Sequence, residues 1–496
     1  MTFTSFIKLK IVVCLLVFGS FSTHAQRGEI RVLPNPDIIL QLANSRIWNA
    51  LPNSAQKRKK DQPARPNIIF ILTDDHRADA LGAMGNKIIQ TPNLDALASS
   101  GILFKKAYVT TSICCISRAS ILSGQYQSRH KINDFNTPFT KKALDKTYPA
   151  LLKKAGYKIG FIGKFGVDGK QQPDSLFDYW ASAKEEQPVY EMRNKDGRPI
   201  HHTDSVGKDI KQFLGKFAGK EPFCLSVSFK APHELDGRPP TFPVQERFKS
   251  LYQNVSIPEP LTADPKYWNS FPKWFKTDQN IARERWKPLL STPELRQKTT
   301  KDYYRLITGV DEVVGNMVAQ LRELQIDGNT IIIFMGDNGF SLGEHGLEGK
   351  WYAYEESVRI PMFISGAPLP RKMKGNKTDR IALNIDIAPT ILALAGVPAP
   401  PTMQGKDLIA MVKKKSLARD DFFYEHTFLG GEQLPKVEAV VAKNFKYMKY
   451  IEHNYEELYN TKKDPYETTN LAQSKAGKAD LTKLRKRYGE LKRAAR

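Results

Sequence analysis

Two continuous apolar runs stand out in the pattern of hydrophobic and polar positions, and each ends in acidic or amide residues. The first is PNIIFILTDD, from Pro66 to Asp75, and the second is TIIIFMGDNG, from Thr330 to Gly339. A short uninterrupted apolar run is typical of a strand that is buried on both faces. The pattern therefore predicts two interior strands with polar side chains at their carboxyl ends.

A helical spacing of apolar residues is clearest between these runs, from Tyr303 to Leu324. Its apolar positions are Leu306, Val310, Val313, Val314, Met317 and Leu321. Strands that alternate with such helices predict an α/β fold, in which a large, mostly parallel sheet is sandwiched by helices. Ligands bind such sheets beyond the carboxyl ends of the strands, where both polar clusters are expected.

The pattern changes toward the C-terminus. Alternation from Val437 to Tyr450 predicts antiparallel strands, and the sequence from Leu481 to Arg493 predicts a basic helix. A chain of 496 residues exceeds one ordinary core, which favours more than one domain. We therefore predict a large domain at 65–410 and a small C-terminal α+β subdomain at 411–496.

The first 25 residues have the pattern of a secretory signal peptide. Lys8 and Lys10 precede the apolar run IVVCLLVF, and STHA supplies small residues for cleavage. The run falls short of the roughly 20 residues of a membrane span, so we expect export without stable membrane insertion. Residues 26–64, which include the basic stretch SAQKRKK, are expected to form an N-terminal extension and linker. The protein would then be periplasmic or secreted.

The net charge is strongly positive. The 75 Lys and Arg against 52 Asp and Glu give +23, and loss of Lys8 and Lys10 with the signal peptide leaves +21. A basic surface favours polyanionic partners such as a sulfated polysaccharide, an anionic membrane surface or nucleic acid, or it is simply well solvated. No nucleic-acid-binding motif accompanies the charge, and export argues against such a partner.

The polar residues after the two predicted strands form a candidate metal site. Asp74 and Asp75 follow the first strand, and Asp337 and Asn338 follow the second. Three carboxylates brought together repel one another unless a cation lies between them, and all-oxygen ligands favour Ca²⁺, with Mg²⁺ as the alternative, over zinc. The competing interpretation is two independent, solvated acidic turns.

Cysteine is scarce, yet two of the four cysteines are neighbours. After loss of the signal peptide, Cys114, Cys115 and Cys224 remain. An odd number of cysteines in an exported protein argues against a disulfide framework. The adjacent pair in SICCISRAS therefore needs a chemical explanation, unless both thiols are merely buried at the start of a helix.

The stretch from Cys114 to Gly124, CCISRASILSG, resembles the sulfatase signature Cys-x-Pro-Ser-Arg-x-x-x-Leu-Thr-Gly. In that family a maturation enzyme oxidises the signature cysteine to formylglycine. Only Cys114 has the right register to Ser117 and Arg118, and Cys115 occupies the free position. The resemblance thus implies that Cys114 is the precursor of a formylglycine, whose hydrated form also binds the cation.

Further segments resemble the same family from about Arg65 to Ala472. They are ILTDDHRADALG, TPNLDALASSGILFKKAYVT, GYKIGFIGKFG, APHE, GDNGFSLGEHGLEGKWYAYEESVRIP, NIDIAPTILALAGV and ELYNTKKDPYETTNLA. The resemblance implies a type I, formylglycine-dependent sulfatase with an alkaline-phosphatase-like fold, whose catalytic domain is the segment 65–410. Two positions depart from the family pattern: Ile116 replaces the usual proline or alanine, and Gly166 stands where a histidine is common. These departures bear on the maturation system and on the base that releases sulfate.

The resemblance also implies roles for individual residues. Lys164 and Lys350 would surround the transferring sulfate with positive charge, and Arg118 would hold the formylglycine. His233 would protonate the leaving oxygen, because histidine titrates near neutral pH. Since Gly166 removes one expected base, His345 or water would assist the release of sulfate.

The segment between His233 and the predicted helix at Tyr303 bears on the substrate. Three tryptophans alternate there with basic residues: Trp268, Trp274 and Trp286 with Lys266, Lys273, Lys276, Arg283 and Arg285. Aromatic faces stack on sugar rings and cations bind sulfate, although tryptophans also pack in cores. Together with export and positive charge, the segment indicates a sulfated polysaccharide or its oligosaccharides, such as ulvan, carrageenan, fucoidan or a glycosaminoglycan.

Two alternatives stay open at this point. Some phosphonate and phosphate monoester hydrolases of the same superfamily use the same formylglycine, and turnover of an aryl phosphate would reveal such an enzyme. A non-catalytic, polyanion-binding homologue would keep Cys114 unoxidised, which mass spectrometry would detect.

Overall fold

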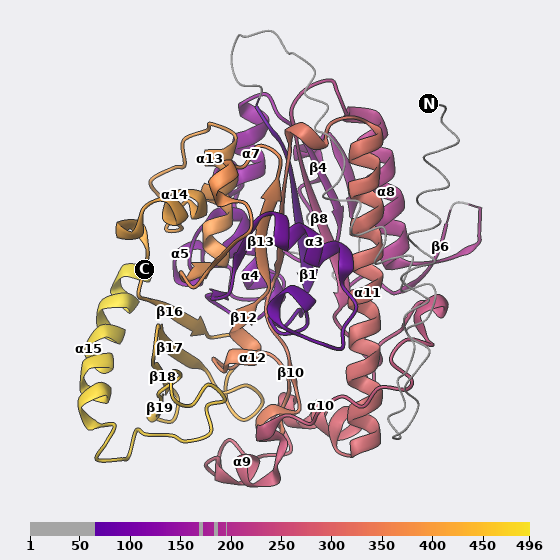
Figure 1. Ribbon diagram of the computed structural model, residues 1–496. Helices are drawn as coiled ribbons and strands as arrows, with labels where there is room; N and C mark the ends of the chain where they lie inside the picture. Colours follow the sequence, from indigo (N-terminus) through magenta and orange to yellow (C-terminus); the bar gives the residue numbers. More distant parts are fainter. Residues whose placement is uncertain (1–64, 168–171, 183–186, 195) are drawn as a thin grey trace, which may run out of the picture. The chain divides into compact units, whose positions relative to one another are not determined.

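The two predicted strands lie side by side within the main sheet of the computed structural model, which describes residues 65–167, 172–182, 187–194 and 196–496 (Figure 1). They are β1 (Asn67–Asp74) and β9 (Thr330–Gly336). The two strands pair in parallel, from Asn67 opposite Thr330 to Thr73 opposite Gly336. Every residue of both strands is buried, as their apolar sequences predict.

Six further strands complete this sheet. In spatial order it contains β14 (Asn376–Thr378), β2 (Ile102–Phe104), β13 (Met362–Gly366), β9, β1, β8 (Phe223–Pro232), β4 (Lys158–Gly163) and β5 (Tyr179–Ser182). β13 runs antiparallel to β2 and β9, and the remaining pairs described in the sheet are parallel. The prediction of a large, mostly parallel sheet is confirmed.

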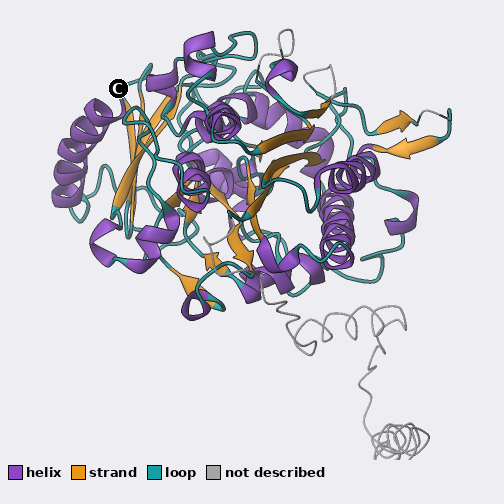
Figure 2. Ribbon diagram, turned by 90° about the horizontal axis from the view of Figure 1, so that it is seen from above, coloured by secondary structure: helices purple, strands orange, loops and turns teal. Residues whose placement is uncertain are grey.

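Helices cover both faces of the sheet (Figures 1 and 2). On one face, α8 (His202–Phe217) and α11 (Pro293–Glu323) pack against β8, and α3 (Pro92–Ser100) lies beside α11. On the other face, α4 (Cys114–Ser123), α7 (Tyr148–Lys154) and α13 (Ile387–Leu394) contact one another. The predicted sandwich of helices around a sheet is therefore confirmed.

The long helix α11 contains the predicted helix and extends it at the N-terminus. It begins at Pro293, and the side chain of Thr292 caps it by accepting a hydrogen bond from the amide of Leu295 at 3.3 Å. The first turns of α11 are mostly polar, so hydrophobic periodicity could not reveal them. The proline at the first helical position and the threonine before it are the sequence signals that mark this start.

A separate antiparallel sheet follows in the C-terminal part. Its strands are β16 (Asp421–His426), β17 (Val437–Ala442), β18 (Lys446–Tyr450) and β19 (Tyr455–Tyr459), and α15 (Lys478–Ala495) packs on them. Leu481 and Leu484 of α15 are buried in one cluster with Val440, Tyr447 and Leu458 of the sheet. The prediction of a small α+β subdomain is thus confirmed.

Shorter elements connect these layers. Small sheets are formed by β6 (Glu191–Arg193) with β7 (Pro199–His201), by β10 (Ser341–Leu342) with β11 (Glu348–Gly349), and by β12 (Arg359–Ile360) with β3 (Ala107–Tyr108) and β15 (Ala382–Leu383). The shorter α-helices include α5 (Gln127–His130), α6 (Lys141–Leu144), α9 (Pro265–Ser270), α10 (Ile281–Leu290), α12 (Glu355–Val358) and α14 (Leu408–Lys413).

The predicted signal peptide at 1–25 and the extension at 26–64 lie outside the described residues. Within the part of the chain that is described, no helix is both long enough and apolar enough to cross a bilayer. The predicted boundary at residue 411 falls inside α14, ahead of the first strand of the C-terminal sheet. These boundaries stay predictions.

Candidate active site

The four polar residues at the ends of β1 and β9 lie together. The backbone amide of Asp75 donates to Asp337 Oδ1 at 3.0 Å, and Asn338 Nδ2 donates to Asp75 Oδ1 at 2.6 Å. Asp74, the last residue of β1, is fully buried, and so are the other three. A φ of 60° at Asp75 puts its backbone in the left-handed region, so the chain turns sharply directly after the strand.

Two lysines from other segments face this acidic cluster. Lys164 Nζ, just after β4, lies 2.5 Å from Asp74 Oδ2, and Lys350 Nζ, just after β11, lies 2.5 Å from Asp75 Oδ2. Both ammonium groups are buried. Burial opposes their charge, but the neighbouring carboxylates raise the pKa of Lys164 and of Lys350 above the ordinary value. Both lysines therefore stay cationic at neutral pH.

Arg118 of α4 connects the segments that surround the cluster. Its Nε donates to Asp337 Oδ2 at 2.9 Å, and its Nη1 donates to Lys164 O at 2.6 Å and to Ser228 Oγ at 2.5 Å. Its Nη2 lies 3.5 Å from Asp74 Oδ2. One buried guanidinium thus fixes α4 against residues at the ends of β1, β4 and β9 and within β8.

Burial and mutual repulsion determine how these acids ionise. Burial raises the pKa of Asp337 to about 7, and repulsion from Asp74 adds to the shift. Burial also opposes ionisation of Asp74, but Lys164 and other nearby cations hold the pKa of Asp74 below its usual range. Burial raises the pKa of Asp75 in spite of Lys350. A divalent cation at this position would stabilise the fully ionised cluster.

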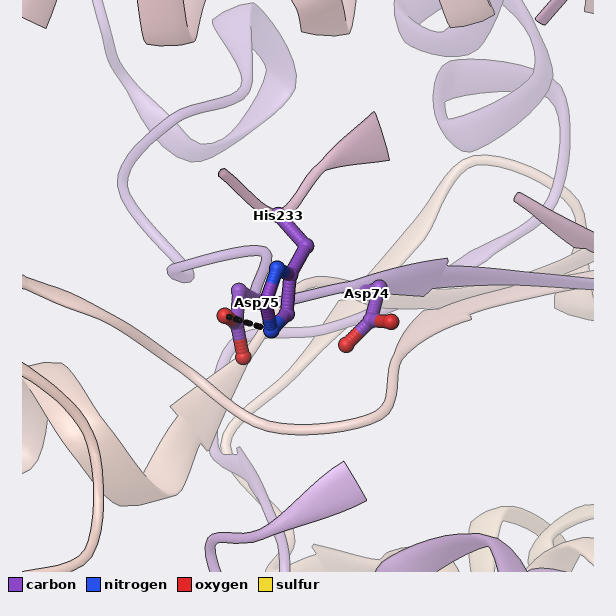
Figure 3. Close-up of side chains that lie close together, drawn as sticks. All are labelled: Asp74, Asp75 and His233. Carbon is purple, nitrogen blue, oxygen red and sulfur yellow. Dashed lines mark ion pairs between the residues drawn. The ribbon is translucent and has the colours of Figure 1, made fainter. Parts of the chain in front are cut away.

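The donor set fits a hard divalent cation. Asp74 Oδ1 and Asn338 Oδ1 are buried and accept no hydrogen bond from any described residue. The amide nitrogen of Asn338 donates to Asp75 and to Gly339 O, so its oxygen is left to face another group. One ligand atom each from Asp74, Asp75 and His233 lies within 4.8 Å of the others (Figure 3). Orphaned carboxylate and amide oxygens are the ligands that Ca²⁺ and Mg²⁺ prefer.

Cys114 lies in the first turn of α4, on the helix side that meets the acids. Residues three and four positions further along a helix share a face with the first. Those residues are Ser117, whose Oγ donates to Asp337 O at 2.5 Å, and Arg118, whose Nε donates to the Asp337 carboxylate. Cys114 is 1% exposed. Burial raises the pKa of its thiol, so an unmodified Cys114 stays protonated and is a weak nucleophile at neutral pH.

Cys115 points away from this cluster. Its Sγ donates to Asp134 O at 3.1 Å, and the residue belongs to the hydrophobic core around β1 and α7. Successive side chains of an α-helix diverge by about 100°, which separates the two thiols. None of the cysteines in the described part of the chain forms a disulfide.

His233 follows β8 and faces Asp75. Its Nε2 lies 3.5 Å from Asp75 Oδ2 (Figure 3). Its Nδ1 donates to Glu234 O at 2.6 Å. Burial, and then the charge of Lys350, lowers the pKa of His233 well below its ordinary value, so the ring is neutral. Because Nδ1 carries the proton in this tautomer, Nε2 presents its lone pair toward the acids.

The structure does not bring His345 to the acidic cluster through any of its described contacts. Its ring stacks on Tyr354 with centroids 4.5 Å apart, and Phe271 lies beside it. Burial and the charge of Lys446 lower the pKa of His345 to about 4. The sequence GEHG does not predict this position, because it depends on the turn at residues 343–346, which places the ring against Tyr354.

Gly166 lies against the cationic side chains of the cluster. A Cβ atom at this position would lie 2.9 Å from Arg118 Cδ and 3.3 Å from Lys164 Cε, and the backbone has φ of 70°. Arg118 and Lys164 therefore occupy the space that a side chain would need. The missing histidine at this position is consistent with that packing.

The three tryptophans of the long connection pack against neighbouring side chains. Arg283 lies between Trp268 and Trp286, with its guanidinium carbon 4.5 Å and 3.6 Å from the two ring centroids. Trp274 stacks on His453 at 3.8 Å. Their faces are thus largely engaged within the protein, as the packing interpretation of these residues predicts.

The sequence does not predict the positions of two further residues, Tyr190 and Lys230. Tyr190 donates from its hydroxyl to His233 O at 2.5 Å, and Lys230 is fully buried within β8. The only sequence signal for Lys230 is a lone charge in the run FCLSVSFKAP.

Two family models match the chain. One, described as Sulfatase, matches residues 66–397, and the other, described as N-sulphoglucosamine sulphohydrolase, C-terminal, matches residues 343–494. The chain is also 28% identical over 505 residues to the N-acetylglucosamine-6-O-sulfatase of Bacteroides thetaiotaomicron, with 88% of this chain and 87% of that protein covered.

Solved structures agree with these matches. A protein in complex with its substrate D-glucosamine-2-N,6-O-disulfate has a TM-score of 0.73 and 26% identity, covering 87% of this chain and 98% of that chain. The phosphonate monoester hydrolase of Agrobacterium radiobacter has the same TM-score of 0.73, with 21% identity over 87% of this chain and 96% of that chain. The second likeness concerns the fold alone.

Proposed function

The chain belongs to the sulfatase family and is a sulfuric ester hydrolase, and from that premise we propose that it is an exported enzyme that releases sulfate from a sulfated carbohydrate. The observation that carries this proposal is the position of Cys114. It lies at the start of α4, whose next turn is fixed to Asp337 through Ser117 and Arg118. This anchoring aims the residue at position 114 toward the acidic cluster and its lysines.

The relatives support an amino-sugar substrate. The Bacteroides thetaiotaomicron relative acts on N-acetylglucosamine 6-O-sulfate, and a structural neighbour binds a disulfated glucosamine. The strongly basic composition suits a polyanionic glycan. We therefore take a sulfated glycosaminoglycan or another sulfated polysaccharide, or its oligosaccharides, as the substrate class.

Two groups complete the site in this proposal. Asp74, Asp75, Asp337 and Asn338 would hold a divalent cation, Ca²⁺ by preference, together with residue 114, and the cation would supply positive charge and lower the pKa of a bound hydroxyl. A formylglycine made from Cys114 by a maturation enzyme would supply, as its hydrate, the oxygen nucleophile that a protonated thiol cannot.

The chain's own cations would position the sulfate ester. Lys164 and Lys350 stay charged because Asp74 and Asp75 raise their pKa values, so both can attract the peripheral oxygens of the sulfuryl group. Arg118 makes its hydrogen bonds to protein groups and would hold residue 114 rather than the substrate. Low exposure strengthens each of these interactions by excluding water.

His233 would protonate the leaving oxygen from Nε2. In the free protein this ring is neutral because burial and Lys350 lower its pKa. A bound sulfate ester adds negative charge beside the ring and raises that pKa, so protonation would accompany substrate binding. We assign the release of sulfate to a water rather than to His345, whose contacts lie in the aromatic cluster with Tyr354.

Mass spectrometry and a paired substrate assay test this function. The peptide from Ala107 to Arg118 should show the mass loss that accompanies conversion of the Cys114 thiol to an aldehyde. Purified protein should hydrolyse an aryl sulfate and glucosamine 6-sulfate faster than an aryl phosphate. Preference for the phosphate would identify a phosphomonoester hydrolase, and an unmodified Cys114 without turnover would identify a non-catalytic, polyanion-binding protein.

A further inference from the structure

Among the buried lysines of the described part of the chain, Lys230 differs in having no carboxylate partner. Four lysines are buried there: Lys164, Lys230, Lys350 and Lys446. Three of them have carboxylate partners, and Lys446, for example, lies 3.0 Å from Glu355 and 2.7 Å from Glu467. Lys230 is fully buried but forms no ion pair with any described carboxylate. Its Nζ donates to Pro188 O at 2.6 Å, a neutral acceptor that leaves the charge uncompensated.

An irregularity in β8 lies at this residue. Leu72 of β1 lies opposite Ser228, and Asp74 lies opposite Pro232, so β8 advances four residues while β1 advances two. Lys230 is in the middle of this bulge. Bulges next to active sites re-aim side chains out of the regular alternation of a strand. The same strand supplies Ser228 to Arg118, and His233 directly follows its last residue, Pro232.

The charged and titratable groups around Lys230 come from several elements. Burial lowers the pKa of Lys230 to about 8, and the charges of Lys164 and Lys350 add to this shift, whereas Asp74 and Asp236 oppose it. On α8, His202 has a buried Nδ1 without a described hydrogen-bond partner, and burial with the charges of His201, Lys230 and Lys164 lowers its pKa to about 3. The ring of Tyr190 lies 5.3 Å from the Lys230 ammonium. The charges of Lys164 and Lys350 thus offset those of Asp74 and Asp236, and the Lys230 ammonium has no net compensating charge.

We infer that Lys230 is a substrate-binding residue whose ammonium pairs with an oxyanion of the sulfated substrate. This inference rests on the proposed function and names a recognition element for it. An uncompensated buried cation is unfavourable in the free protein, and an incoming sulfate or carboxylate removes that cost. The oxyanion is either the sulfate that is cleaved or a second anionic group on the same sugar, and the two sources differ in the substrates that reveal them.

Lys230→Met tests the inference, because methionine keeps a long unbranched side chain without the charge. Lys220→Met is the matched control, since Lys220 is exposed and its Nζ donates only to Lys216 O among the described groups. We would measure kcat/KM on an aryl monosulfate, on glucosamine 6-sulfate and on glucosamine 2-N,6-O-disulfate. Loss of one charge-assisted hydrogen bond should lower kcat/KM by about 10- to 100-fold.

The pattern of losses identifies the oxyanion. A loss on all three substrates supports pairing with the scissile sulfate, and a loss confined to the disulfated sugar supports pairing with a second anion. Lys230→Met that stays within about twofold of Lys220→Met on every substrate overturns the inference, because a charge-assisted contact is worth more than that. A wild-type protein that hydrolyses no sulfate ester contradicts the proposed function instead.

A wild-type measurement keeps the test valid if Lys230→Met does not fold. Inorganic sulfate should bind more weakly as the pH rises through about 8, because Lys230 then loses its proton while Lys164 and Lys350 stay charged. Calorimetric titration with sodium sulfate measures this binding without turnover. Lys230→Arg should shift the decline to higher pH, since arginine stays protonated. Sulfate affinity that is constant from about pH 7 to 9 overturns the inference.

Discussion

Replacement of Asp337 by asparagine tests whether one buried carboxylate limits the stability of the metal-free protein. Asp337 is fully buried, and burial followed by repulsion from Asp74 raises its pKa from 3.8 to about 7. In the unfolded chain this carboxyl loses its proton near its ordinary pKa, whereas the folded protein keeps the proton until about pH 7. The folded state therefore binds more protons within this window, so the free energy of unfolding falls as the pH rises.

The size of the effect follows from the shift. About three pKa units at about 1.4 kcal/mol each give a loss of about 4 kcal/mol between about pH 4 and pH 7. Below this window both states hold the proton, and above it both have lost it. Asp337→Asn has no proton to lose, so the metal-free variant should lack this decline. It should resemble the wild type at low pH and exceed its stability by up to about 4 kcal/mol above neutrality.

Calcium should reverse that order. The ion stabilises the ionised carboxylate, so the wild type should gain more stability from calcium than Asp337→Asn, which has lost a charged ligand. Urea unfolding followed by tryptophan fluorescence, across this pH range with chelator or with calcium, measures both effects. Asp327→Asn, at an exposed position, is the control. Parallel pH profiles for the wild type and Asp337→Asn in chelator, or equal stabilisation of both by calcium, would refute the reasoning.

Three further predictions concern the same site. Cys114→Ala should abolish sulfatase turnover in a steady-state aryl sulfate assay. Cys115→Ala should keep most of the activity, because the Cys115 thiol donates to Asp134 O and points away from the acidic cluster. The opposite pattern would contradict the assignment of Cys114 as the formylglycine precursor. Cys114→Ser, with only one hydroxyl, should not sustain repeated turnover. Chelation of the wild-type enzyme should remove activity, and calcium should restore it, so full activity after extensive dialysis against chelator would exclude an essential metal. Gly166→Ala should lower both stability and kcat, because its Cβ would lie 2.9 Å from Arg118 Cδ and because a left-handed backbone costs a non-glycine residue about 1–2 kcal/mol. Gly197→Ala is the control, since Gly197 has φ of 75° but nothing within 4 Å of the added Cβ. Thermal unfolding of this control measures the backbone cost alone.

The parts of the fold that the sequence predicts are those whose signal is local. The apolar runs of β1 and β9 and the periodic residues of α11 report burial directly, and all of them are buried in the structure. The acids follow from the same signal, since parallel neighbouring strands bring their ends together. The first turns of α11 are polar, and only the Thr292 cap with Pro293 marks them.

The parts of the site that the sequence does not predict depend on tertiary contacts. Gly343 and His345 both have left-handed backbone angles, and the turn that they form places the His345 ring against Tyr354. Lys230 lies in a bulge of β8, which no periodic pattern reveals. Trp274 lies in a segment whose aromatic and basic residues suggest sugar binding, but its ring stacks on His453, which lies in the connection between β18 and β19. The positions of these three side chains depend on which distant segments pack together, and local sequence patterns do not contain that information.

The burial of Cys114 has a consequence for the timing of the proposed formylglycine formation. A thiol that is 1% exposed and surrounded by the chain is out of reach of another protein once α4 has formed. If Cys114 is oxidised as proposed, a maturation enzyme would have to act before this region folds, during synthesis or before export is complete. Chains that fold first would be trapped as stable thiol forms that no later encounter can activate. The yield of active molecules would then depend on the relative rates of folding and oxidation, and slower folding at low temperature should favour the active form.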